Sequence, residues 1–259
     1  MLLELGVLIG AGVLAGYVNA VAGAGSLLTL PALIFTGLDA GAANATNRIA
    51  VLFQNAAAIV AFRRGGVRFG TGPWILCIPA GAGAVGGAWV ATLLSDSELR
   101  LAIAVAMVVF LGLTFASRKK DAEQKAAADG PPTPPALRWT MFPGFLAIGF
   151  YAGFLQAGVG VVILLYLSLA YGADLVGSNA LKVTVILVLA AVALGVFALA
   201  GETIDAVRGL SLAAATTVGG YLGARDSLVR GERFVRVILV LAVLLSAAKL
   251  TWDALGGAD

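Results

Sequence analysis

Long apolar runs separated by short polar turns fill most of this sequence, and the first run is the most informative. It extends from Leu5 to Thr36, which at 1.5 Å per residue is too long for one straight crossing of a bilayer. Glycines interrupt it at Gly23-Ala24-Gly25. The pattern predicts two shorter helices, 5–22 and 25–37, joined by a turn. In a membrane, the unpaired backbone groups at such a break must face protein or a polar path.

A second break of the same kind occurs downstream. The string AGFLQA at 152–157 corresponds to AGYVNA at 15–20, and Gly158-Val159-Gly160 corresponds to the first glycine break. The charged, proline-rich stretch 117–138 predicts a linker between the halves. Each half, 1–116 and 139–259, is predicted to hold a broken pair and three further spans. The second broken pair is predicted at 139–157 and 158–172, and the other spans at 43–62, 73–94, 99–116, 178–200, 207–224 and 234–252.

The distribution of Lys and Arg predicts the orientation, because short cytoplasmic loops are enriched in both residues. Basic residues lie in the turn at 63–68, in the linker and in the turn at 225–236, whereas the turns at 95–98 and 201–206 carry acids and neither Lys nor Arg. Residues 95–98 also predict a helix N-cap. If each broken pair enters and leaves on one side, the linker is cytoplasmic and both termini lie outside. The predicted fold is therefore an all-α polytopic membrane protein with two inverted-topology repeats, an architecture typical of secondary transporters.

Composition agrees with a membrane protein and narrows its chemistry. Hydrophobic residues make up 60% of the 259 positions and charged residues 12%, compared with roughly 25% charged in soluble domains. The net charge of +3 lies in loops, so nucleic-acid binding is not indicated. There is no histidine, one cysteine, and no Asp or Glu in the middle of a predicted span. This argues against an enzyme, a metal site and a cofactor.

A cation follows each broken pair at the same place. Arg48 lies in NATNR at 44–48, and Lys182 lies in SNALK at 178–182. Asn44, Arg48 and Asn55 lie close to one face of the first of these helices, with Asn47 and Gln54 beside them. Such a polar stripe must face protein or water in a membrane. Two other interpretations stay open: the cations snorkel to lipid headgroups, and the asparagines form hydrogen bonds between helices.

The residues around the two breaks suit a small oxyanion. Helix N-termini present N–H groups and a positive partial charge, glycines allow close backbone approach, and hydroxyl and amide side chains add donors. Close packing is the alternative explanation for the glycines, since GxxxG pairs occur elsewhere in the chain. The predicted substrate-binding residues are Asn19, Gly23, Gly25, Ser26, Asn47, Arg48, Asn55, Gln156, Gly158, Gly160 and Lys182.

These motifs resemble a known family. LAGYVNAVAGAGSLLTLPAL at 14–33 and ATNRIAVLFQNAAAIVAFRRGG at 45–66 resemble the opening repeat of the TauE/SafE sulfite exporter family. GFYAGFLQAGVGVVILLYL at 149–167 resembles its second repeat, although the family often has a GPGTG-like string where this chain reads QAGVG. The resemblance implies a transporter of the bacterial inner membrane for small sulfur-containing or organic anions, such as sulfite, sulfonates or sulfoacetate.

The sequence therefore predicts a secondary transporter whose cargo binds between the two repeats. Its partners are a small anion and the lipid bilayer, with a homodimer as a further option. An anion channel-like pore is a rival within the same class. A membrane scaffold or assembly protein without transport is a rival of a different class.

Overall fold

The computed structural model describes residues 2–116, 137–171 and 175–227, and its regular elements there are all α-helices. The predicted boundaries agree with them to within about three residues. The linker up to residue 136 and the predicted span 234–252 lie outside the described residues. The helices are α1 (Leu2–Ala22), α2 (Ser26–Phe35), α3 (Ala40–Arg64), α4 (Gly72–Ala91), α5 (Asp96–Ala116), α7 (Met141–Phe154), α8 (Val159–Tyr171), α9 (Leu175–Leu199) and α10 (Ala206–Ser227).

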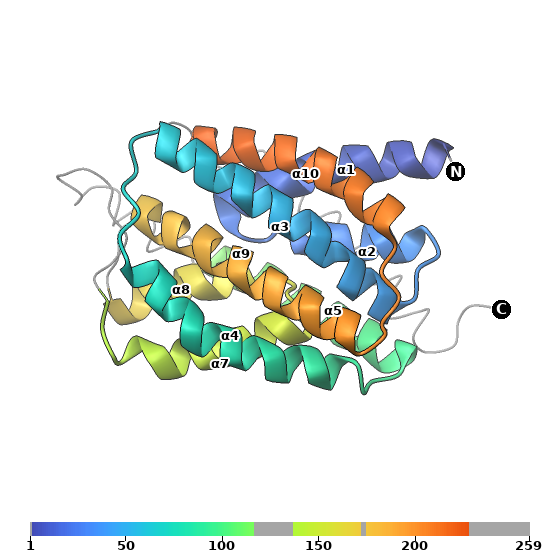
Figure 1. The fold of residues 1–259 in the computed structure, drawn as a ribbon. Helices are drawn as coiled ribbons and strands as arrows, with labels where there is room; N and C mark the ends of the chain where they lie inside the picture. The colour runs from blue at the N-terminus through green and yellow to red at the C-terminus, as the bar shows by residue number, and fades with distance from the viewer. Residues whose placement is uncertain (1, 117–136, 172–174, 228–259) are drawn as a thin grey trace.

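The helices lie roughly along one direction (Figure 1). Six of them pack in the order α1, α10, α3, α9, α4 and α7. The pair α1 and α10 lies at the top of that view, and the pair α4 and α7 lies at the bottom. The pair α1–α2 starts and ends at the right, whereas the pair α7–α8 starts and ends at the left. The two breaks therefore point toward each other in the middle of the molecule.

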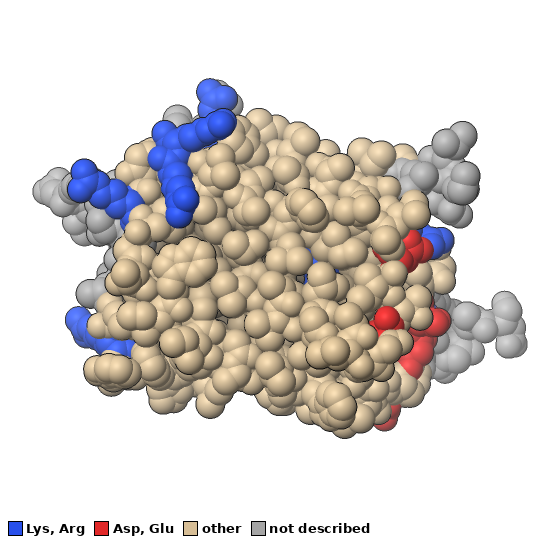
Figure 2. All heavy atoms as spheres, in the orientation of Figure 1, with Lys and Arg blue, Asp and Glu red and all other residues tan. Residues whose placement is uncertain are grey.

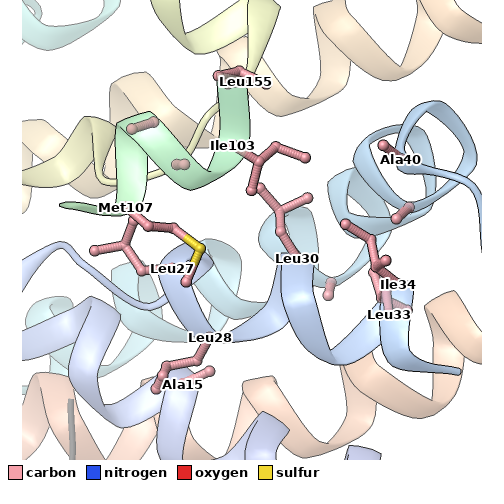
Figure 3. Packing of buried hydrophobic residues seen from close by; sticks show 14 of the residues in the cluster. Ala15, Leu27, Leu28, Leu30, Leu33, Ile34, Ala40, Ile103, Met107 and Leu155 are labelled. Atoms are coloured by element: carbon pink, nitrogen blue, oxygen red, sulfur yellow. The ribbon is translucent and has the colours of Figure 1, made fainter. Parts of the chain in front are cut away.

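Helix α2 has ten residues, too few to span a bilayer, and other helices enclose it. Leu27 and Leu30 are fully buried and lie beside Met107 and Ile103 of α5, as Figure 3 shows. Helix α1 covers another side of α2. Because lipid tails are as apolar as leucine, this contact is stabilised by close packing more than by exclusion of water. It gives the break between α1 and α2 the protein cover that its backbone requires.

Glycines set the two closest helix contacts, α1 with α10 and α4 with α7. A Cβ on Gly16 would collide with the Thr216 carbonyl, and one on Gly87 would collide with the Phe150 carbonyl. Close packing is therefore the correct explanation for the GxxxG pairs, because they lie at these contacts. They are Gly12/Gly16, Gly83/Gly87, Gly149/Gly153 and Gly219/Gly223.

Charged side chains gather at the two ends of the helices and leave a band almost without charged side chains between them (Figure 2). The basic end, at the left, includes Arg63, Arg64, Arg68, Arg138 and Arg225. The acidic end, at the right, includes Asp39, Asp96, Glu98, Glu202 and Asp205. Within the described residues, three helices are long and apolar enough to cross a membrane, namely Ala40–Arg64, Gly72–Ala91 and Val176–Leu199. This pattern is typical of a multi-pass membrane protein.

Turns at the acidic end begin helices, as the sequence predicts for residues 95–98. Ser95 and Glu98 form a reciprocal capping box: the Ser95 N–H donates to the Glu98 carboxylate at 2.8 Å, and the Glu98 N–H donates to the Ser95 hydroxyl at 3.4 Å. Hydrogen bonds from the Ser95 hydroxyl and N–H hold the pKa of Glu98 below its usual value. Asp205 caps α10, and the backbone N–H of Arg208 is the largest cause of the lowered pKa of Asp205.

Candidate functional site

The two breaks cross in contact at Gly23 and Gly160. Neither position has room for a side chain, because a Cβ on either glycine would collide with the backbone of the other. Gly23 also has φ of +75°, which favours glycine. Ser26 joins the two breaks: its hydroxyl donates to the Gln156 carbonyl at 2.9 Å and accepts from the Gly158 N–H at 3.2 Å. The glycine–glycine contact and the shared serine bring both breaks to one place.

Arg48 of α3 caps the C-terminal end of α7. Its guanidinium is fully buried and donates to the carbonyls of Ala152 at 2.6 Å and Gly153 at 2.8 Å. It also donates to the side-chain oxygens of Gln156 and Asn44. A helix leaves its last four carbonyls without helical partners, and here three of these lie within reach of α3. Arg48 therefore donates hydrogen bonds to carbonyls that lipid tails could not satisfy.

The other two of those four carbonyls also have partners. Asn44 donates from its amide nitrogen to the Phe154 carbonyl at 2.7 Å. The Tyr151 carbonyl accepts from the Leu155 N–H at 3.0 Å. Every one of the last four carbonyls of α7 is thus satisfied, and three of the four are satisfied by side chains of the other half of the chain.

Lys182 of α9 caps the C-terminal end of α1, as Arg48 caps that of α7. Its ammonium is fully buried and donates to the carbonyls of Asn19 at 3.0 Å and Ala20 at 3.3 Å. A third bond, at 2.6 Å, reaches the Asn179 side chain. Each half of the chain thus contributes one cation that closes the broken helix of the other half.

These positions differ from the sequence-based expectation in two ways. The helices begin earlier than predicted, at Ala40 and Leu175, so both cations lie roughly 10–12 Å inside their helices and do not snorkel to headgroups. Both cations also bind carbonyl oxygens at helix C-termini instead of joining the N–H groups of helix N-termini. The alternative interpretation, that asparagines form hydrogen bonds between helices, applies to Asn44.

The break between α7 and α8 begins earlier than the predicted end of its first helix at residue 157. Helix α7 ends at Phe154, because Arg48 and Asn44 take up its last carbonyls. Gln156 follows with φ of +58°, which is uncommon for a residue other than glycine and costs on the order of 1 kcal/mol. The hydrogen bond from Arg48 to its side chain helps to hold this conformation.

A small pocket lies where the breaks meet. The unfilled space there, part of which is open to the outside, is about 270 Å³. Six of the ten lining residues are polar, and no Lys, Arg, Asp or Glu of the described chain is among them. The lining consists of Asn19, Ser26, Thr29, Asn47, Ala50, Val51, Gln54, Gln156, Val159 and Ile186.

Several polar atoms of this lining are buried and lack a partner, namely Thr29 Oγ1, Asn47 Nδ2, Asn47 Oδ1 and Gln156 Nε2. Buried polar atoms without hydrogen bonds are rare in folded proteins, and each demands an explanation. The orientation of the Gln156 amide is fixed by chemistry, because Arg48 can only donate and so must face the oxygen. The amide nitrogen of Gln156 is left as a donor for the pocket.

Four of the eleven predicted substrate-binding residues line this pocket: Asn19, Ser26, Asn47 and Gln156. Gly23, Gly25, Gly158 and Gly160 form the breaks beside it, and Arg48 and Lys182 cap the helices behind it. Asn55 is buried but lies outside the lining, where its amide nitrogen donates to the Val51 carbonyl of its own helix. Thr29 and Gln54 also line the pocket. A helical face shared with Ser26 and Asn47 is the signal that indicates them.

Comparison with known proteins identifies the family of the chain. The family profile described as "Sulfite exporter TauE/SafE" matches residues 8–250. The chain is similar to "Probable membrane transporter protein YfcA" of Escherichia coli K12, with 29% identity over 98% of this chain and 92% of that protein. It is also similar to "Probable membrane transporter protein ORF9" of Sinorhizobium sp., with 26% identity over 93% of this chain and 89% of that protein.

A third relative, "Probable membrane transporter protein" of Haemophilus influenzae, is 28% identical over 96% of this chain and 95% of that protein. No solved structure matches the chain. The family and the names of these relatives support a membrane transporter rather than an enzyme.

Proposed function

The chain belongs to the TauE/SafE sulfite exporter family, and we propose that it moves a small sulfur-containing or organic anion, such as sulfite or a small sulfonate, across the inner membrane. The cargo binds in the pocket at the two helix breaks. The observation that carries the proposal is the set of unpartnered donors in this pocket, from Thr29, Asn47 and Gln156. Oxyanions bind through such donors in proteins.

The helix ends around the pocket favour negative charge. Four ends meet there, two C-terminal and two N-terminal, and each carries about half an elementary charge. Lys182 and Arg48 offset the negative C-terminal ends of α1 and α7. The positive N-terminal ends of α2 and α8 remain, and Ser26 and Val159 bring their first turns into the lining. The two cations thus act on the cargo through the field of the site, without touching the cargo.

Inverted repeats, 1–116 and 139–259, provide the route for transport. The packing order α1, α10, α3, α9, α4 and α7 reads the same from either end when α1 is equated with α7, α3 with α9 and α4 with α10. The opposite directions of the pairs α1–α2 and α7–α8 also support this symmetry. Rearrangement of the broken pairs then opens the pocket alternately to the two sides of the membrane.

The basic end is cytoplasmic in this proposal, and the acidic end lies outside. The grouping of Arg63, Arg64, Arg68, Arg138 and Arg225 at one end supports it, because Lys and Arg are retained on the cytoplasmic side. The start of α1 then lies outside, as the sequence predicts.

Flux of labelled sulfite into proteoliposomes tests the proposal and separates its rivals. A transporter gives saturable uptake that is accelerated by unlabelled sulfite inside the vesicle. A channel-like pore gives uptake without saturation or acceleration, and a scaffold gives none. Either of these last two results would contradict a carrier mechanism.

Gln156→Glu tests the pocket itself. The carboxylate keeps an acceptor for Arg48, so the protein is expected to fold, but it replaces a donor with a negative charge facing the cargo. Sulfite flux is expected to fall at least about tenfold. Thr29→Val, which removes one hydroxyl from the lining, is expected to lower affinity a few fold. Thr184→Val is its matched control, because the Thr184 hydroxyl is buried on α9 and bonds only within its own helix. Unchanged flux in Gln156→Glu would exclude this pocket as the site.

A further inference from the structure

The side-chain amides of Asn19 and Gln156 form hydrogen bonds that define their orientation, and the side-chain amide of Asn47 forms none. The side-chain oxygen of Asn19 accepts from the Gly25 N–H at 3.3 Å, and that of Gln156 accepts from Arg48. Both amides therefore use their oxygen for the protein and face the pocket as donors. Asn47 is fully buried, lines the same pocket, and has no partner for either its oxygen or its nitrogen.

This pair of unpartnered atoms demands both a donor and an acceptor from whatever fills the pocket. The demand does not depend on which way the amide is turned, because both atoms lack partners in either orientation. A fully deprotonated oxyanion offers only acceptors, so it would leave the Asn47 oxygen unsatisfied and beside negative charge. Leaving a buried acceptor unpaired is more costly than making a neutral hydrogen bond is favourable.

The charge of the pocket limits the charge of its occupant. The described lining contains no ionised side chain, and the N-terminal ends of α2 and α8 together supply about one positive charge. The cost of bringing an ion out of water rises with the square of its charge, so a dianion pays about four times the penalty of a monoanion. Arg48 and Lys182 exceed the half charges of the C-terminal ends that they cap, which adds about one more positive charge behind the lining. The attraction between the site and its occupant only doubles from a monoanion to a dianion, so it offsets the smaller penalty better than the larger one.

We infer that the pocket selects a singly charged oxyanion that carries its own O–H or N–H donor, as a hydrogen-oxyanion or an amino-substituted sulfonate does. The donor of the cargo meets the Asn47 oxygen, and its oxygens meet the donors of Gln156 and Thr29. This inference rests on the proposed function, since it assumes that the pocket holds an anion.

Three tetrahedral ions separate the effect of net charge on affinity from the effect of a hydrogen-bond donor. Sulfamate, methanesulfonate and sulfate are all X–SO₃ ions, in which X is NH₂, CH₃ and O⁻. At neutral pH the first two are monoanions of nearly equal size, and only sulfamate has N–H donors. Titration calorimetry on the purified full chain is expected to give a dissociation constant about fivefold lower for sulfamate than for methanesulfonate, as one added hydrogen bond implies. Sulfate is expected to bind most weakly.

The variant Asn47→Leu tests whether Asn47 causes the preference for sulfamate over methanesulfonate. The variant is expected to bind sulfamate and methanesulfonate equally. Asn55→Leu is the matched control, because Asn55 is a buried amide on the same helix but outside the pocket lining, and it should keep the fivefold ratio. The comparison of probes on the unchanged protein decides the matter even if Asn47→Leu fails to fold.

Two results would overturn the inference while leaving the proposed function intact. Equal binding of sulfamate and methanesulfonate would mean that water, and not the cargo, donates a hydrogen bond to the Asn47 oxygen. Tightest binding of sulfate would mean that the charge of the ion affects its affinity more than an N–H donor does. Absence of binding by all three ions to the folded protein would instead count against the proposed anion site, and the inference would fail with it.

Discussion

The break between α1 and α2 and the break between α7 and α8 touch at Gly23 and Gly160, yet different side chains hold them. The first spans three residues with glycine at the left-handed position, and one cation, Lys182, reaches its carbonyls. The second spans four residues, places Gln156 in a left-handed conformation, and depends on Arg48, Asn44, Ser26 and Tyr151.

The difference shows how an unpaired helix end is stabilised in a membrane. Glycine and backbone bonds close most of the first break, so a compact ammonium suffices there. The second break keeps a side chain at Gln156 that contributes a donor to the pocket, and the planar fork of Arg48 can hold both that side chain and two carbonyls. The half that carries the more strained backbone is thus the half that needs more support from its partner.

Arg48→Met is expected to have the largest effect. It strands the carbonyls of Ala152 and Gly153 and the oxygen of Gln156 in a buried site, at about 1–3 kcal/mol for each acceptor. The free energy of unfolding should fall by about 3 kcal/mol or more. Urea unfolding in detergent measures this. Arg64→Met is the control, since Arg64 is exposed at the end of the same helix. Equal losses of unfolding free energy in the two variants would mean that the hydrogen bonds from Arg48 to the end of α7 stabilise the fold no more than an exposed arginine does.

Lys182→Met is expected to cost less, about 1–3 kcal/mol in the same measurement. The reason is that the Asn19 carbonyl also accepts from the Gly23 N–H at 2.9 Å, so it keeps one hydrogen bond. The Ala20 carbonyl and the Asn179 side-chain oxygen lose the bond from Lys182. A loss as large as that of Arg48→Met would remove the difference between the two breaks.

Ser26→Ala tests the support that the first half gives to the second break. The change removes the acceptor for the Gly158 N–H and the donor for the Gln156 carbonyl, and about 1–2 kcal/mol should be lost. Ser178→Ala is the matched control, because the Ser178 hydroxyl is equally buried and has no partner. Its removal should leave stability unchanged or slightly higher. If both serines behave alike, Ser26 does not join the breaks.

The sequence predicts the helices well because apolar runs of membrane length, separated by polar turns, leave little choice of structure. The positions of the breaks follow from the glycines for the same reason. The end of α7 is three residues earlier than predicted, because Arg48 and Asn44 reach it from another part of the fold. Local sequence does not contain that contact.

The candidate site was only partly predictable. The repeated cation indicates that Arg48 and Lys182 matter, but the helix end that each one faces depends on how the two halves pack. Likewise, Asn47 and Asn55 look equivalent from composition, and the packing of α3 brings only Asn47 to the pocket lining. Sequence identifies polar residues that must avoid lipid, whereas the fold decides whether each one faces the protein or the pocket.

Tyr151→Phe is expected to have the smallest effect, and it isolates a brace that only the second break has. The Tyr151 hydroxyl donates to the Ala157 carbonyl within that break, so its loss should cost about 0.5–1.5 kcal/mol. Tyr166→Phe is the control, because the Tyr166 hydroxyl bonds to the Thr140 carbonyl at an exposed position where water can replace it. A measurable loss in Tyr151→Phe alone would show that the longer break needs support along its whole length. Equal behaviour of the two tyrosines would confine that support to Arg48, Asn44 and Ser26.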